Sequence, residues 1–322
     1  MAALAAVVTP VYNGAEYLEQ TMACVQAQSY RPLLHVVVDN ASTDDTPNII
    51  RRFANGRVPV RTSRNRETLP VGKNWSLAAS LVPREAKYFQ ILCADDLLRP
   101  DAVEKMVAVA ESDPAVELVG SLQRRGTRLK KSALRTERST FDGAEVARAF
   151  LQKRSDDIPH AFGLFRRHES DFEGDFFDLP NLCLDTDACL RALCRGKFGF
   201  VHEPLHEFRL HEAQLSRAAL WIGRRNVWEP LTLIDRWARH VMPADEAADC
   251  FNRHLRVVYR YMLAWRLTGK SEVLARYRAL LAERGIRPGF GDYARSVLEW
   301  PLIKLLKYQR PVDADRRVTP AA

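Results

Sequence analysis

Short apolar runs alternate with amphipathic stretches through the first hundred residues of the chain. Continuous apolar runs of four to eight residues are typical of buried strands, and apolar positions three and four apart are typical of helices. The pattern predicts strands at residues 4–9, 33–39, 58–62 and 88–93, and helices at 17–28, 46–53, 71–81 and 101–111. Alternating strands and helices predict an α/β fold with a mainly parallel sheet.

The second half of the chain has a different pattern. Residues 116–122, 198–201 and 205–210 predict further strands, whereas 143–152 and 186–193 predict helices. From residue 219 to 308 the pattern is mostly helical, with breaks at Pro243, at Gly269 and at residues 285–291. We therefore expect an α/β domain at residues 1–216, a C-terminal helical region at 217–310 and a flexible tail at 311–322.

The composition is that of an ordinary globular protein, with 47% hydrophobic and 27% charged residues among 322. A net charge of +8 suits a protein that meets phosphates or anionic lipid. Part of the excess lies in a basic segment at 123–139, which is either a solvated surface loop or a contact for an anionic substrate or membrane face. No nucleic-acid-binding motif is present, so nucleic acid is not an expected partner.

Several features bear on where the protein works. The six cysteines show no Cys-x-x-Cys pair or zinc-type spacing, which predicts reduced thiols in a cytoplasmic protein. The first residues lack the features of a signal peptide, and no apolar run reaches the ~18 residues of a membrane span. The apolar stripe at 297–308, with Lys304 and Lys307, either packs on the domain, forms a homodimer or lies on the inner face of a membrane.

The strongest chemical signal is the pair Asp95 and Asp96, directly after the apolar run at 88–93. In open α/β sheets, ligands gather at the carboxyl ends of the strands. Carboxylate oxygens favour Mg²⁺ or Mn²⁺, which commonly also bind the phosphates of a substrate. The alternative is that the two carboxylates cap the helix that begins near Pro100.

Two other strands also end in polar residues. Thr-Pro-Val-Tyr-Asn-Gly at 9–14 closes the first strand in a turn, and Asp39 opens a polar cluster after the second. Asp39 is suited to accept hydrogen bonds from a base or sugar, whereas Ser42, Thr43 and Asp44 are good helix caps.

Taken together, the motifs at 9–14, at 37–46 (Val-Val-Asp-Asn-Ala-Ser-Thr-Asp-Asp-Thr) and at 94–96 (Ala-Asp-Asp) resemble the family 2 glycosyltransferases of GT-A fold. The resemblance continues through residues 65–74, where Glu67 stands at a position at which glycine is common. It also covers 162–167, 175–178, 184–191 and 208–216, and so extends over about two-thirds of the chain. The helical remainder matches no family that we can name.

The resemblance implies a GT-A domain with a Rossmann-like mixed sheet. Its activity would be the metal-dependent, inverting transfer of a sugar from a UDP-, GDP- or dTDP-linked donor to a hydroxyl group. The acceptor would be a saccharide or a lipid-linked saccharide in polysaccharide or glycoconjugate biosynthesis. The implied cofactor is Mn²⁺ or Mg²⁺.

The resemblance also implies residue roles. Asp96 and His211 would bind the metal, and Asp185, at a helix start, would be the general base; Leu184 replaces the glutamate that usually precedes it, and Asp187 is the neighbour to exclude. His160 lies where the family shapes its acceptor pocket, although a structural histidine fits equally well. The expected donor contacts are Pro10, Tyr12, Asp39, Asn65, Lys73, Asn74, Asp95 and Arg209.

Two other readings stay open at this point. A sugar-nucleotide nucleotidyltransferase would also use a metal and a nucleotide, but it needs a glycine-rich phosphate loop, which residues 9–14 do not form. A catalytically inactive glycosyltransferase-like binding protein would keep the same fold without turnover.

Overall fold

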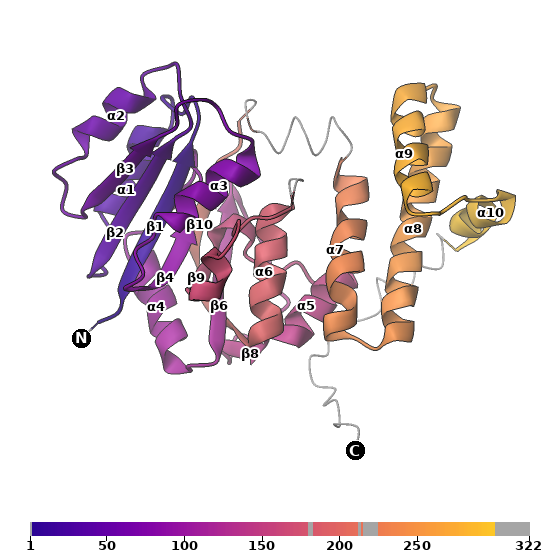
Figure 1. The fold of residues 1–322 in the computed structure, drawn as a ribbon. Helices are drawn as coiled ribbons and strands as arrows, with labels where there is room; N and C mark the ends of the chain where they lie inside the picture. Colours follow the sequence, from indigo (N-terminus) through magenta and orange to yellow (C-terminus); the bar gives the residue numbers. More distant parts are fainter. Residues whose placement is uncertain (1, 180–182, 212–213, 215–224, 300–322) are drawn as a thin grey trace. The chain divides into compact units, whose positions relative to one another are not determined.

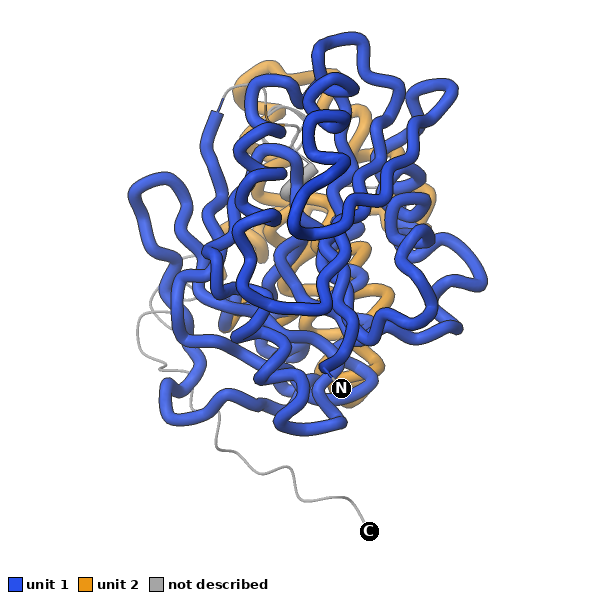
Figure 2. Tube along the Cα trace, turned by 90° about the vertical axis from the view of Figure 1, so that its left-hand side faces the viewer, with its two compact units in different colours: residues 1–150, 155–212 blue, residues 151–154, 213–322 orange. Residues whose placement is uncertain are grey.

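The computed structural model describes residues 2–179, 183–211, 214 and 225–299. It divides the chain into two compact units, shown in different colours in Figure 2: residues 1–150 with 155–212, and residues 151–154 with 213–322. The domain boundaries expected at residues 216 and 310 lie outside the described residues.

The first unit is built around one mixed sheet (Figure 1). Its main path runs β3-β2-β1-β4-β9-β6-β10-β5, with β7 paired to β6 and β8 to β10. The strands are β1 (Leu4–Val11), β2 (Leu33–Asp39), β3 (Val60–Arg64), β4 (Ala86–Ile91), β5 (Leu97–Leu98), β6 (Val116–Arg125), β7 (Arg128–Leu129), β8 (Thr140–Asp142), β9 (Leu164–Arg166) and β10 (Lys197–Phe208).

The strand directions decide where a site can form. β1, β2, β3 and β4 pair with one another in parallel, β9 is antiparallel to both β4 and β6, and β10 is parallel to β6. The carboxyl ends of β1, β2, β4, β6 and β10 therefore all meet at one edge of the sheet. This mixed, largely parallel sheet confirms the α/β prediction.

Helices cover both faces of the sheet, as the consecutive apolar runs require. Residues 5–8 of β1 are each at most 1% exposed, so neither face of this strand meets solvent. Side chains of α1 and α4, including Val25 and Met106, pack with Ala5 and Val7 in one core cluster. The helices of this unit are α1 (Leu18–Gln26), α2 (Thr46–Arg52), α3 (Val71–Ser80), α4 (Ala102–Ser112), α5 (Gly143–Leu151) and α6 (Leu184–Arg195), with short 3-10 turns η1 (His160–Phe162) and η2 (Glu169–Phe172).

The expected strands at 198–201 and 205–210 form one strand, β10. Its pairing with β6 shifts register between Val201 and Pro204 and again between Pro204 and His206. Proline cannot donate to the ladder and is tolerated at such irregular positions, which explains why the sequence pattern looked interrupted.

The second unit is helical, as the sequence predicts. It contains α7 (Arg225–Val241), α8 (Ala244–Leu267), α9 (Ser271–Glu283) and α10 (Phe290–Leu298). Gly269 and Gly285, each at φ +69°, lie after α8 and α9 in a conformation that favours glycine. The core includes Leu231 of α7 and the rings of Trp265 and Tyr277, whose centroids are 4.6 Å apart.

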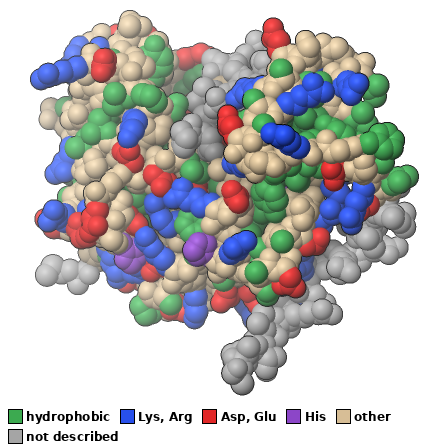
Figure 3. All heavy atoms as spheres, turned by 45° about the vertical axis from the view of Figure 1, so that its right-hand side comes forward, with side chains coloured by type: hydrophobic (Ala, Val, Ile, Leu, Met, Phe, Trp, Pro, Cys, Tyr) green, Lys and Arg blue, Asp and Glu red, His purple; other side chains and the backbone are tan. Residues whose placement is uncertain are grey.

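The described residues include only part of the segments that the sequence predicts to lie at the surface. No helix among the described residues is long and apolar enough to cross a bilayer. Most of the stripe at 297–308 and the tail at 311–322 lie outside the described residues. On the face drawn in Figure 3, Lys and Arg side chains are interspersed with Asp and Glu. Within the basic segment at 123–139, the first residues extend β6 and fold back through β7, so this part is a hairpin.

Candidate active site

The sheet brings distant polar residues to the edge where its parallel strands end. Tyr12 follows β1, Asp39 ends β2, Asp95 and Asp96 follow β4, and Arg209 follows β10. In the strand order, β4 lies beside β1 and is separated from β10 by β9 and β6. The carboxyl ends of β4 and β10 lie at the same edge of the sheet. A site at this edge is the one that open α/β sheets favour.

Asp96 is the most buried carboxylate at this edge, with 1% of the residue exposed. Its Oδ1 accepts a hydrogen bond from the backbone N–H of Arg209 at 3.0 Å. Its Oδ2 is buried and receives no hydrogen bond from any described residue. Burial, followed by the charge of Asp95, raises the pKa of Asp96 well above its usual range, and the N–H of Arg209 only partly opposes this. A buried carboxylate oxygen with no donor is suited to a cation.

The neighbours of Asp96 fit a hard divalent cation. One potential ligand atom each of Cys93, Asp95 and Asp96 lies within 4.8 Å of the others. Burial, together with the charges of the two carboxylates, raises the pKa of the Cys93 thiol well above its usual value, and a sulfur is in any case a poor ligand for a hard cation. The donor set is therefore the two carboxylates, which suit Mn²⁺ or Mg²⁺ rather than zinc.

His211 lies beside this carboxylate pair. Its Nε2 is 2.9 Å from Oδ2 of Asp95, and its ring lies 4.5 Å from the ring of Tyr17. The imidazole therefore reaches the same carboxylate pair as the proposed metal.

The helix-cap reading of the carboxylate pair is wrong. The short strand β5 lies between Asp96 and α4, and the residue that flanks the start of α4 is Asp101. Because β5 pairs with β10, a strand of the sheet separates the two carboxylates from the start of α4.

Arg209 anchors the end of β10 to α1. Its guanidinium donates to Oε1 of Gln20 at 2.6 Å and to Oγ1 of Thr21 at 3.1 Å, and it also lies 4.8 Å over the ring of Tyr17. Its Nε donates to the backbone carbonyl of Asp95. This residue therefore holds the loop that carries Asp95 and Asp96 in place, and its expected contact with a diphosphate stays a prediction.

Asp39, at the end of β2, is 2% exposed. Its carboxylate accepts a hydrogen bond from the N–H of Ser42 at 2.9 Å and pairs with Arg64 at 3.1 Å. The same loop binds the turn after β1, because the N–H of Asn13 donates to Oγ of Ser42 at 2.9 Å. These bonds fix Asp39 between the ends of β1 and β3.

Three asparagines support this loop. Nδ2 of Asn65 donates to Oδ1 of Asn40 at 2.7 Å and to Oδ1 of Asn74 at 3.0 Å. Asn74 is 4% exposed, so its amide is held inside the fold. These contacts place the expected donor residues Asn65 and Asn74 together, next to the Asp39 loop.

The remaining expected donor contacts are more dispersed. Lys73 forms an ion pair with Asp175. Pro10 is buried within β1, whereas the ring of Tyr12 is 52% exposed. The exposure of Tyr12 at a strand end leaves its ring available to a ligand.

Asp185 is the second residue of α6 and is half-buried. Its charge contributes to the raised pKa of Cys93, so Asp185 lies near the residue that precedes the carboxylate pair by two positions. Asp187 is 2% exposed, and its charge acts on Arg191 in the same helix. Besides burial, both acids also raise the pKa of the Cys189 thiol in this helix, and the assignment of Asp185 as the base stays a prediction.

Arg125 was not singled out by sequence reasoning as a site residue. It ends β6, and its guanidinium lies 5.3 Å over the ring of Phe208 at the end of β10. Its charge lowers the pKa of Asp96, against the larger effects of burial and of Asp95. In the sequence, its position at a strand end within the basic segment was the feature that could have indicated a role at the site. The pairing of β6 with β10 then places it near Asp96.

The mixed sheet and its helices form a fold of the GT-A class. Two solved structures are similar over most of the chain. S. aureus TarS 1–349 has a TM-score of 0.64 at 13% identity, with 93% of this chain and 82% of that one covered. The mannosyltransferase PcManGT from Pyrobaculum calidifontis, in complex with GDP-Man and Mn²⁺, has a TM-score of 0.56 at 17% identity, with 95% and 87% covered. At these identities the likeness shows the fold.

The chain belongs to glycosyl transferase family 2, whose model matches residues 6–172. Among curated proteins, the Bacillus subtilis teichuronic acid biosynthesis glycosyltransferase TuaG is 29% identical over 146 residues, which cover 44% of this chain and 56% of that protein. GlyG, a glycosyltransferase of Streptococcus pneumoniae, is 25% identical over 123 residues, covering 38% and 40%. The match thus spans about half the length of these relatives.

Proposed function

We propose that this protein is a metal-dependent inverting glycosyltransferase that moves a sugar from a nucleoside-diphosphate donor to an acceptor hydroxyl. The observation that carries the proposal is the buried Asp96 carboxylate, whose Oδ2 has no donor among the described residues and lies beside Asp95. A family 2 match over residues 6–172 supports the same activity.

The proposed residue roles are those that the family resemblance implies, and the positions of these residues at one edge of the sheet support them. Asp96 and Asp95 would hold Mn²⁺ or Mg²⁺, with His211 next to them. When bound, such an ion supplies positive charge where the diphosphate leaving group develops negative charge. Asp39 would contact the nucleoside, and the Asn65–Asn74 pair would support that loop.

Asp185 would act as the general base. Inversion by single displacement requires a group that takes the acceptor proton while the hydroxyl attacks from the face opposite the leaving group. A half-buried carboxylate at a helix start, close enough to Cys93 to raise the pKa of its thiol, would meet this need.

The donor and acceptor classes are proposed from similar proteins. TarS has been solved with UDP-GlcNAc and PcManGT with GDP-Man, which supports a UDP- or GDP-linked donor, with dTDP to be compared. TuaG is named for teichuronic acid biosynthesis, which supports a saccharide acceptor in polysaccharide or glycoconjugate assembly.

Calorimetric titration with UDP, GDP and dTDP tests the donor site, each with Mn²⁺ and again with EDTA. We expect one nucleotide to bind in a metal-dependent manner, and Asp96→Asn to abolish this binding. Asp113→Asn is the matched control, because Asp113 is paired with Lys197 before β6, at the opposite edge of the sheet. Binding that survives EDTA or Asp96→Asn would contradict the proposed metal site.

A second variant separates an enzyme from an inactive binding protein. Asp185→Asn should keep nucleotide affinity and lose sugar transfer, because it removes the base and leaves the carboxylate pair intact. Nucleotide binding without any turnover by the unmodified protein would favour a glycosyltransferase-like binding protein.

A further inference from the structure

His160 has an unusual backbone at the start of η1. Its φ is +54°, in the left-handed region that residues other than glycine rarely adopt. Backbone of this kind persists where the surrounding contacts hold it in place, and it is common at functional sites. Here the His160 ring contacts Thr186 in the first turn of α6.

One nitrogen of His160 is connected to Asp185 through a single hydroxyl group. Nδ1 of His160 lies 2.8 Å from Oγ1 of Thr186, and this oxygen lies 3.2 Å from Oδ1 of Asp185. The backbone N–H of Thr186 donates to the same Oδ1 at 2.6 Å. Both contacts involve Oδ1, so Oδ2 of Asp185 is left for a ligand within the described part of the chain.

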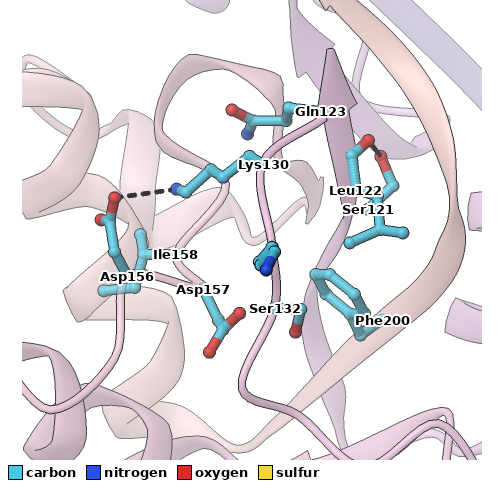
Figure 4. A pocket seen from close by; sticks show the side chains of 10 residues that line it. Ser121, Leu122, Gln123, Lys130, Ser132, Asp156, Asp157, Ile158 and Phe200 are labelled. Atoms are coloured by element: carbon cyan, nitrogen blue, oxygen red, sulfur yellow. Dashed lines mark hydrogen bonds and ion pairs between the residues drawn. The ribbon is translucent and has the colours of Figure 1, made fainter. Parts of the chain in front are cut away.

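The other nitrogen of His160 faces a carboxylate. Nε2 lies 3.4 Å from Oδ1 of Asp156, whose Oδ2 pairs with Lys130 at 3.0 Å (Figure 4). Burial would raise the pKa of Asp156, but the hydrogen bond and charge of His160, together with Lys130, hold it below its usual range. Asp156 is therefore an acceptor, and Nε2 of His160 is the donor in this contact.

The direction in which the Thr186 hydroxyl donates depends on whether Nδ1 of His160 carries a hydrogen. A threonine hydroxyl has one hydrogen to donate. When Nδ1 of His160 also carries a hydrogen, it donates to Oγ1, and the Thr186 hydroxyl is free to donate to Asp185. When Nδ1 carries none, the hydroxyl donates to the ring instead, and Oδ1 of Asp185 loses that hydrogen bond.

We propose that His160, acting through Thr186, is a positioning residue for the base Asp185. When both ring nitrogens of His160 carry a hydrogen, the hydroxyl and the backbone N–H of Thr186 hold Oδ1 with two hydrogen bonds and so direct Oδ2 toward the acceptor hydroxyl. Asp156 and Lys130 hold the His160 ring from its other side. This inference rests on the proposed function, because it assigns a support to the base of that reaction.

Thr186 offers the sharpest test, because valine has the shape of threonine without its hydroxyl and serine keeps the hydroxyl. The assay is release of the nucleoside diphosphate from UDP-GlcNAc, GDP-mannose and dTDP-glucose with Mn²⁺ and water as the acceptor. We expect Thr186→Val to lower kcat at least about tenfold, a part of the roughly 10²- to 10⁴-fold effect of a general base. KM for the donor should change little, and Thr186→Ser should restore most of kcat.

His160 variants distinguish its two nitrogens. His160→Asn supplies an amide donor near the position of Nδ1, whereas His160→Gln supplies one near Nε2. We expect Asn to retain more of kcat than Gln, with both variants melting within a few degrees of the unmodified protein. His168→Asn is the control, because His168 is also paired with a carboxylate, that of Glu117, but at the opposite edge of the sheet.

The outcomes separate the inference from the function on which it rests. Turnover that Asp185→Asn abolishes, but that Thr186→Val and His160→Gln leave unchanged, overturns the inference alone. No nucleotide release by the unmodified protein from any of the three donors, or full activity of Asp185→Asn, overturns the assigned base as well. A loss in Thr186→Val that Thr186→Ser does not restore also counts against the inference, since the hydroxyl would then not be the group that matters.

Discussion

Asp96 accepts a hydrogen bond at 3.0 Å from the backbone N–H of Arg209, a residue 113 positions later in the chain. The bond joins the loop after β4 to the end of β10, and the Arg209 side chain continues to Gln20 and Thr21 in α1. Three separate parts of the sequence thereby fix one carboxylate, and only one of its two oxygens is satisfied by the described protein.

Removing the charge of Asp96 should stabilise the metal-free protein while abolishing its response to metal. A buried carboxylate without a partner on one oxygen costs free energy, and an asparagine amide at that position does not carry this cost. We expect the free energy of unfolding of Asp96→Asn to rise by about 1 kcal/mol in EDTA. Thermal melts with Mn²⁺ should show a shift for the unmodified protein and none for the variant. A lower melting temperature for Asp96→Asn in EDTA would contradict this account.

Arg125 should contribute to nucleotide affinity. Its guanidinium is held over Phe208 at 5.3 Å, close enough to Asp96 to lower that residue's pKa, and it forms no ion pair within the described part of the chain. A cation so placed is suited to a diphosphate. We expect Arg125→Gln to weaken nucleoside-diphosphate binding about tenfold in calorimetry, the effect of roughly one such contact. Arg84→Gln, at an exposed position between α3 and β4 at the opposite edge of the sheet, is the control and should bind normally.

His35 should make folding stability depend on pH. Burial lowers the pKa of His35 from 6.5 to about 3, and its Nε2 is 3.0 Å from Oγ1 of Thr9. Because the pKa is lower in the folded than in the unfolded protein, this contribution to stability is present above pH 6.5 and is lost as the pH falls toward 3. From pH 7 to pH 5 the loss should be about 2 kcal/mol.

His35→Gln is the variant that isolates this contribution. Glutamine keeps a polar group near Thr9 but does not titrate, so urea unfolding of the variant should show a shallower pH dependence by this amount. His206, whose pKa burial also lowers to about 3, is present in both proteins and cancels in the comparison. Parallel pH profiles for the two proteins would sink the assignment to His35.

The helical unit should depend on its small apolar core. Leu231 is fully buried in the cluster that contains Trp265 and Tyr277. Leu231→Ala should reduce the free energy of unfolding by about 2–5 kcal/mol, because it leaves a cavity that neighbouring side chains only partly fill. Leu267→Ala removes the same atoms at a position that is 79% exposed and should change stability by no more than about 0.5 kcal/mol. Chemical denaturation followed by circular dichroism measures both. Equal effects of the two substitutions would mean that this cluster does not support the unit.

The sequence predicted a strand or helix correctly where the hydrophobic pattern lay within that element itself. Strand β2 begins and ends at the residues that its apolar run predicts, because Leu33 to Asp39 is a continuous run that stops at a polar cluster. β10 read as two strands because Pro204 and the register shifts near it interrupt the pattern. The antiparallel insertion of the three-residue strand β9 between β4 and β6 leaves almost no periodic signal, so it was not predicted.

The sequence by itself determined the residue types of the site and their positions at strand and helix ends: Asp39 and the Asp95–Asp96 pair follow from an abrupt change between apolar and polar residues, and Asp185 follows from the family resemblance. Only the tertiary structure decided which of these groups meet and which are already bound by the protein. It gave Arg209 structural partners, placed Arg125 near Asp96 and connected His160 to Asp185 through Thr186. The physical reason is that local patterning reports burial and periodicity along the chain, whereas hydrogen bonds between residues 26 to 113 positions apart depend on strand order and register, which no local pattern specifies.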